Sequence, residues 1–228
     1  VQHHSRAQLV VGVADDLELT DWLNNYILPL EARHVNREMV YWGSLLAAAE
    51  MIKSGTTAFC DMYVFGDEVA RAVKQAGMRC LLGEGLLDFP SPNAETTADG
   101  LACTRRLIEK WGDDPLINII VHPHSLYACA PSTLAAAKKI ADEYHLPYAL
   151  HLLENKTESA QLQQMFGQKA LAFLKNSGYL TDRLLAYHCV VMDGQDIELF
   201  ADRGCKVIHC PESNMKLASG VAPVPAML

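Results

Sequence analysis

From residue 36 onward the chain alternates between two hydrophobic patterns, and this alternation limits the fold more than any other feature of the sequence. Amphipathic stretches with helical spacing are each followed by a short β-branched or apolar run that ends in polar residues. Such repeats are typical of βα units, in which parallel strands alternate with helices. The sequence therefore predicts an α/β fold.

The predicted elements can be read in order along the chain. Helices are expected over residues 36–54, 67–75, 98–111, from Pro131 onward, 157–176 and 193–203. Strands are expected before Val11 and over 56–63, 78–87, 116–122, 146–151, 184–191 and 205–210. About seven βα strands predict most of a (β/α)8 barrel of the TIM type, forming one domain over 1–228 with its eighth strand beyond Leu228. A doubly wound open sheet is the alternative, although no Gly-rich phosphate loop follows any strand.

Charge and composition narrow the class of function. The net charge is −8 and no cluster of Lys and Arg is present, which argues against binding to nucleic acid. No run reaches the roughly 18 apolar residues that span a bilayer, and no leader segment is seen, so neither a membrane nor secretion is expected. Seven scattered cysteines without a C-x-x-C pair predict free thiols in a reducing, cytoplasmic compartment. A small neutral or cationic substrate fits this composition.

One apolar strand carries the most informative pair of residues. The run over 148–154 delivers His151 and, three residues later, Glu154. Residues i and i+3 of a continuing strand face opposite sides, so this pair shares a site only if the chain turns into a loop after the histidine. The polar run over 154–157 permits such a turn. Glu154 would then suit general acid/base chemistry, and the alternative is that it caps the following helix.

Histidines recur where the predicted strands end, at His4, His124, His151, His188 and His209. In a barrel these carboxyl ends converge on one face. Imidazole is the commonest protein ligand of zinc-like metals, so the set predicts a metal site. A lone histidine at a strand end is more often structural, and we apply that interpretation to His209.

Short motifs that match one family occur in order along nearly the whole chain. They include His151-Leu-Leu-Glu154 and the Ser-Asn-Met-Lys run that begins at Ser213. The matching segments are residues 12–17, 29–33, 41–46, 53–57, 61–63, 122–127, 151–154, 187–189 and 211–220. With them the chain resembles the amidohydrolase superfamily, specifically its 5-methylthioadenosine/S-adenosylhomocysteine deaminase branch with its triazine chlorohydrolase relatives.

The resemblance implies a fold and a reaction. The fold is a metal-dependent (β/α)8 barrel with a small β-sandwich built from both chain ends, here lacking the eighth strand and the sandwich. The reaction is hydrolytic deamination of an adenine nucleoside, such as 5-methylthioadenosine or S-adenosylhomocysteine, with release of ammonia. The resemblance thus implies a hydrolase of C–N bonds in cyclic amidines with one divalent metal ion of the zinc type.

Site residues can be assigned by position in the family motifs. The resemblance implies His4, His151 and His188 as metal ligands, with His188 also orienting the attacking water. Glu154 corresponds to the proton shuttle and also contacts the substrate.

Two further residues are implied on the substrate side. His124 corresponds to the histidine that contacts the purine, and Glu31 to the carboxylate that binds the ribose hydroxyls. A carboxylate can accept two hydrogen bonds from a vicinal diol, which supports Glu31 independently. The alternatives are a turn residue for His124 and a solvated helix-end charge for Glu31.

Two departures from the family pattern keep other functions open. The first histidine of the family's His-x-His motif is replaced by Gln2, and the aspartate of the eighth strand would lie beyond Leu228. One alternative is a chlorohydrolase or aminohydrolase acting on a triazine, guanine or a pyrimidine. Another is an incomplete barrel without activity that serves as a binding or assembly module. Because an open barrel leaves strand edges unpaired, we expect a homo-oligomer.

Overall fold

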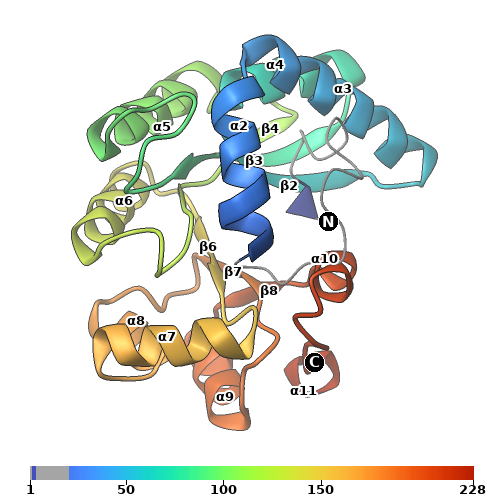
Figure 1. The fold of residues 1–228 in the computed structure, drawn as a ribbon. Helices are drawn as coiled ribbons and strands as arrows, with labels where there is room; N and C mark the ends of the chain where they lie inside the picture. The colour runs from blue at the N-terminus through green and yellow to red at the C-terminus, as the bar shows by residue number, and fades with distance from the viewer. Residues whose placement is uncertain (1, 4–20) are drawn as a thin grey trace. The chain divides into compact units, whose positions relative to one another are not determined.

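The structure is a computed structural model that describes residues 2–3 and 21–228. Contacts within the chain divide it into two compact units, residues 1–122 and residues 123–228. In each unit, parallel strands alternate with helices (Figure 1). The predicted α/β alternation is therefore observed in both.

The first unit is built on a parallel sheet with the strand order β1-β2-β3-β4. Its strands are β1 (Gln2–His3), β2 (Ala58–Tyr63), β3 (Arg79–Leu86) and β4 (Ile117–Ile119). Its helices are η2 (Trp22–Ile27), α2 (Leu28–His34), α3 (Arg37–Lys53), α4 (Gly66–Ala76) and α5 (Thr97–Trp111). The sequence pattern did not predict η2 and α2, which precede the first clear βα repeat.

Local signals explain where these helices begin and end. Asn36 caps α3, because its side chain accepts a hydrogen bond from the Met39 amide at 3.0 Å. Gly77 ends α4 in the left-handed region, with φ of 71°, where glycine carries no steric cost. Thr96 and Asp99 form a reciprocal capping box at the start of α5.

The second unit contains the parallel sheet β6-β7-β8. Its strands are β6 (Tyr148–Leu152), β7 (Leu184–His188) and β8 (Lys206–Ile208), and β5 (His122–Pro123) lies at the junction of the units. Its helices are α6 (Pro131–Glu143), α7 (Lys156–Phe166), α8 (Ala170–Asn176), α9 (Gly194–Asp202), α10 (Pro211–Lys216) and α11 (Val224–Met227). Every residue of β6 is buried, so this strand belongs to the unit's core.

The single helix predicted over 157–176 is wrong, because the segment forms two helices, α7 and α8. The break occurs at Gly167, which has φ of 64° and ends α7. A glycine adopts this left-handed conformation without steric cost, and here that local effect outweighs the helical hydrophobic spacing. The strand predicted over 116–122 is likewise interrupted, between Ile119 and His122.

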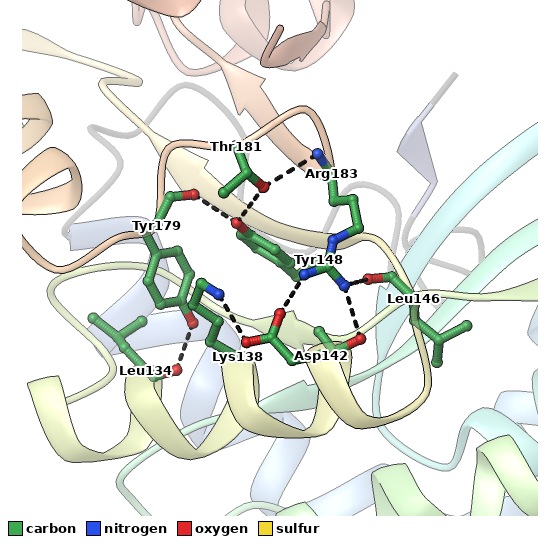
Figure 2. A network of polar contacts seen from close by, with 9 residues as sticks. Leu134, Lys138, Asp142, Leu146, Tyr148, Tyr179, Thr181 and Arg183 are labelled. Atoms are coloured by element: carbon green, nitrogen blue, oxygen red, sulfur yellow. Dashed lines mark hydrogen bonds and ion pairs between the residues drawn. The ribbon is translucent and has the colours of Figure 1, made fainter. Parts of the chain in front are cut away.

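A polar network holds the amino-terminal end of β6 (Figure 2). The Tyr148 hydroxyl donates to the Tyr179 carbonyl at 2.7 Å and lies 2.8 Å from the Thr181 hydroxyl. Arg183 donates to the Leu146 carbonyl at 3.2 Å and forms an ion pair with Asp142 of α6. These bonds satisfy buried polar atoms at the end of the strand opposite His151, so they serve stability.

The structure bears on the expected lack of a membrane span and on the state of the thiols. No helix in the described part of the chain is long and apolar enough to cross a bilayer. All seven cysteines are free, and Cys60, Cys80, Cys129, Cys189 and Cys210 are buried. The predicted absence of a disulfide framework is confirmed.

Candidate functional site

The chain leaves β6 directly after Leu152 and turns into a loop, as the sequence predicts for a shared His151–Glu154 site. Leu153 adopts a left-handed conformation with φ of 52°, and Glu154 follows it outside the strand. Asn155 caps α7, since its side chain accepts a hydrogen bond from the Glu158 amide at 2.8 Å. The helix cap is therefore Asn155 and not Glu154, whose carboxyl remains available for another role.

Three imidazole rings gather beside this loop. The rings of His124 and His151 have centroids 4.6 Å apart, and those of His151 and His188 stack at 5.3 Å. His188 Nε2 lies 3.7 Å from Oε2 of Glu154. The second unit thus brings together four of the residues that the sequence singles out.

Hydrogen bonds fix which nitrogen of each ring carries a lone pair. Nδ1 of His151 lies 2.9 Å from the His124 carbonyl oxygen, which only accepts, so Nδ1 bears the proton in the neutral ring. Nδ1 of His188 lies 2.8 Å from Oδ1 of Asn214, which assigns the same tautomer. In both rings Nε2 is then the basic nitrogen. Such outer hydrogen bonds are the usual way in which metal-ligating histidines are oriented.

The orientation of His188 requires strained backbone. It is paired in register with Leu152, and in a regular strand its side chain would face away from that of His151. Its φ of 68° interrupts the alternation, and Cys189 follows with φ of 50°. Each left-handed residue other than glycine costs roughly 1–2 kcal/mol, and such strain clusters at functional sites.

Burial sets the protonation states at this site. It raises the pKa of Glu154 to about 7, with the Ser219 hydroxyl opposing the effect. Burial lowers the pKa of His188, although the hydrogen bond with Asn214 acts in the opposite direction. Burial, together with the charge of His188, lowers the pKa of His124 to about 4. Near neutral pH the imidazoles of His124 and His188 are therefore uncharged, the state that a metal ligand needs, while Glu154 can exchange a proton.

The metal-binding capacity of the site follows from these donors. Imidazole and carboxyl groups are donor types that bind zinc, so the residues present fit such an ion. Within residues 2–3 and 21–228, however, no three His, Cys, Asp or Glu side chains are already arranged around one position. His4, the third ligand implied by the sequence, lies outside the described residues. The full ligand set stays a prediction.

The remaining predicted residues are Glu31 and His209. Glu31 belongs to the first unit, on α2, where it is 9% exposed, so the alternative of a solvated charge is wrong. Its role toward a ribose stays a prediction. His209 is exposed beyond β8, and its structural role stays a prediction.

Sequence reasoning missed two residues that orient this site. Asn214, on α10, contacts His188 from 26 residues away, and no local signal in the sequence indicates that pairing. Glu158 lies in the first turn of α7 and binds the backbone of the loop. The spacing of Asn155 and Glu158 matches a capping motif, so this second residue had a detectable signal.

Comparison with known proteins places the chain in a family. The model of the amidohydrolase family matches residues 1–228. The chain belongs to this family. Among curated relatives, it is 59% identical to 5-methylthioadenosine/S-adenosylhomocysteine deaminase 1 of Syntrophus aciditrophicus (strain SB), with 100% of this chain and 52% of that protein covered. The amidohydrolase chain thus spans about half the length of the curated relatives it matches.

Solved structures agree with this assignment. An adenosine deaminase from Xanthomonas campestris with bound zinc superposes with a TM-score of 0.96 at 39% identity, over 99% of this amidohydrolase chain and 52% of that one. An atrazine chlorohydrolase from Arthrobacter aurescens, in complex with zinc, gives a TM-score of 0.90 at 17% identity over 99% and 55%. The second likeness shows the fold alone. The predicted family and the predicted amidohydrolase type of α/β barrel, present here in part, are confirmed.

Proposed function

We propose that the protein is a metal-dependent deaminase of an adenine nucleoside, such as 5-methylthioadenosine or S-adenosylhomocysteine. The proposal is supported by membership of the amidohydrolase family and by the 59% identity to a relative with that name. The observation that carries it is a buried carboxyl, that of Glu154, with a pKa near 7, placed 3.7 Å from the basic nitrogen of His188.

The proposed metal is one divalent ion of the zinc type. His151 and His188 would hold it together with His4, and the lowered pKa of His188 favours this role. When bound, such an ion supplies a Lewis acid that lowers the pKa of water to about 7. The zinc-bound adenosine deaminase of similar structure supports this choice of metal.

Glu154 is proposed to carry the proton. With a pKa near 7 it can take a proton from the attacking water and deliver it to the departing amine at neutral pH. Its burial keeps bulk water from competing for that proton. His188, held at Nδ1 by Asn214, would orient the water, while His124 would contact the purine and Glu31 the ribose hydroxyls.

Replacing Glu154 by glutamine tests this proposal, because the amide has nearly the same size and shape as the carboxyl group but cannot take up or release a proton. Ammonia release from 5-methylthioadenosine should fall at least about 100-fold in kcat, the lower end for general acid/base catalysis, while metal content stays unchanged. The matched control is Glu198→Gln on the exposed side of α9, which should retain full activity. Turnover of E154Q at the wild-type rate would refute the assigned role.

A substrate panel separates the proposal from its alternatives. S-adenosylhomocysteine, adenosine, guanine and a chlorotriazine, each assayed for ammonia or chloride release, distinguish a nucleoside deaminase from the related hydrolases. Activity on guanine or the triazine alone would overturn the proposed substrate class. No turnover on any member, in metal-loaded protein, would favour a binding or assembly module.

Compartment and assembly complete the proposal. A reducing, cytoplasmic location is supported by seven free cysteines, five of them buried. A homo-oligomer is supported by Trp42 and Leu46, which are 54% and 43% exposed one turn apart on α3.

A further inference from the structure

A single buried side chain holds the loop that carries Glu154. The carboxyl group of Glu158 accepts the Leu153 amide at Oε1, at 3.1 Å, and the Glu154 amide at Oε2, at 2.6 Å. Glu158 is only 4% exposed. Both of its oxygens are therefore committed to two consecutive backbone N–H groups of the loop.

This arrangement differs from the other helix caps of the same chain. At α5 the carboxyl of Asp99 accepts the amide of the cap residue itself, Thr96, at 3.0 Å. At α9 Asp196 likewise accepts the amide of its cap residue, Asp193, at 3.1 Å. Both acids occupy the third position of the helix, as Glu158 does in α7.

Besides its own cap residue, Asn155, Glu158 also binds the backbone amides of the two residues before it. Its extra methylene relative to aspartate provides the additional reach. Helix capping needs only the bond to the cap residue, so the bonds to Leu153 and Glu154 are not explained by stability of α7. They fix the segment in which Leu153 adopts its left-handed conformation.

We infer that Glu158 is a positioning residue for Glu154. By holding the backbone of Leu153 and Glu154, it keeps the Glu154 carboxyl directed toward His188. Burial raises the pKa of Glu158 to about 7, while both of its oxygens accept hydrogen bonds from backbone amides of the loop. The inference deepens the proposed function and rests on it.

Glu158→Asp is the decisive variant, because aspartate retains the charge but has the length of Asp99 and Asp196. It should form an ordinary capping box with Asn155 and so keep the thermal stability of the protein. At the same time it should lose its hold on the loop, with kcat at least tenfold lower, KM within about threefold and metal content unchanged. Glu158→Gln should also lose kcat, since its amide group would face one backbone N–H.

The matched control is Asp196→Asn, which weakens an equivalent cap at α9. It should lower stability without a selective loss of kcat. The inference is overturned if E158D keeps wild-type kcat, or if D196N loses as much kcat as E158Q.

Hydrogen exchange separates this inference from the proposed function. The amides of Leu153 and Glu154 should be protected in the wild-type protein and should exchange at least tenfold faster in E158D, whatever the activity. Absence of deamination by the wild-type protein would count against the proposed function alone. Unchanged exchange in E158D would count against the role of Glu158 alone.

Discussion

Replacing Glu84 by glutamine should change how the stability of the first unit depends on pH. Glu84 lies on β3 and is 3% exposed. It accepts a hydrogen bond from the Gly66 amide at 2.9 Å and another from the Asn93 side chain. Glutamine can keep both contacts, because the Asn93 amide can rotate and accept where it now donates. The substitution therefore removes the ionisation with little change in shape.

The sign of the effect follows from the pKa of the carboxyl. Burial raises it from 4.5 to about 7, against the opposing amides of Gly66 and Phe65 and the charges of Arg106 and Arg37. Between pH 4.5 and pH 7 the carboxyl group is protonated in the folded state but ionised in the unfolded state. Its contribution to stability is therefore fully present below pH 4.5 and is lost as the pH rises to about 7. At about 1.36 kcal/mol per pKa unit, the total is about 3 kcal/mol, of which about 2.5 kcal/mol falls between pH 5 and pH 8.

Urea unfolding followed by tryptophan fluorescence measures this term, since all three tryptophans lie in the first unit. The free energy of unfolding of E84Q, relative to wild type, should rise by about 2.5 kcal/mol from pH 5 to pH 8. The control is Glu109→Gln, on the exposed side of α5. Its free energy of unfolding should differ from that of the wild type by the same amount at pH 5 and at pH 8. A constant difference for E84Q as well would refute the reasoning.

Two further substitutions in the second unit have separate expected outcomes. Asn214→Ala removes the partner of His188 Nδ1 and should weaken metal binding by about 10- to 100-fold, measured by competition with a chelator; unchanged affinity would exclude an orienting role. Tyr148→Phe leaves the Tyr179 carbonyl and the Thr181 hydroxyl without their shared partner and should lower the free energy of unfolding by about 1–3 kcal/mol in a denaturant titration, with kcat retained. If Y148F lost kcat while keeping full stability, the network at the amino-terminal end of β6 would have a role beyond stability.

The fold was largely predictable because its signals are local. Alternating hydrophobic patterns, Asn36 and Gly77 set most element bounds to within a few residues. The break at Gly167 shows where such reasoning fails. Periodicity over a long window favoured one helix, whereas a single residue able to adopt positive φ ended it.

The sequence singled out four residues that the second unit brings together, but it did not predict their geometry. The polar run after His151 indicated a turn, and the turn brings Glu154 beside the imidazoles. The pairing of Asn214 with His188 depends on where α10 lies after β8, which no pattern near either residue encodes. Residues at strand ends can thus be recognised from sequence, while the groups that orient them come from the tertiary structure.

His188 shows why orientation is the harder part. Strict alternation along β7 would turn its ring away from His151, and only the left-handed backbone at His188 and Cys189 brings the two rings to 5.3 Å. That conformation is unfavourable by itself, so neighbouring contacts must maintain it. The Cys189 amide donates to the Leu152 carbonyl at 3.0 Å, and Asn214 holds the ring at Nδ1. The strain at this strand end is therefore linked to the arrangement of the candidate ligands, and substitutions that relax it should disturb metal binding before they disturb the fold.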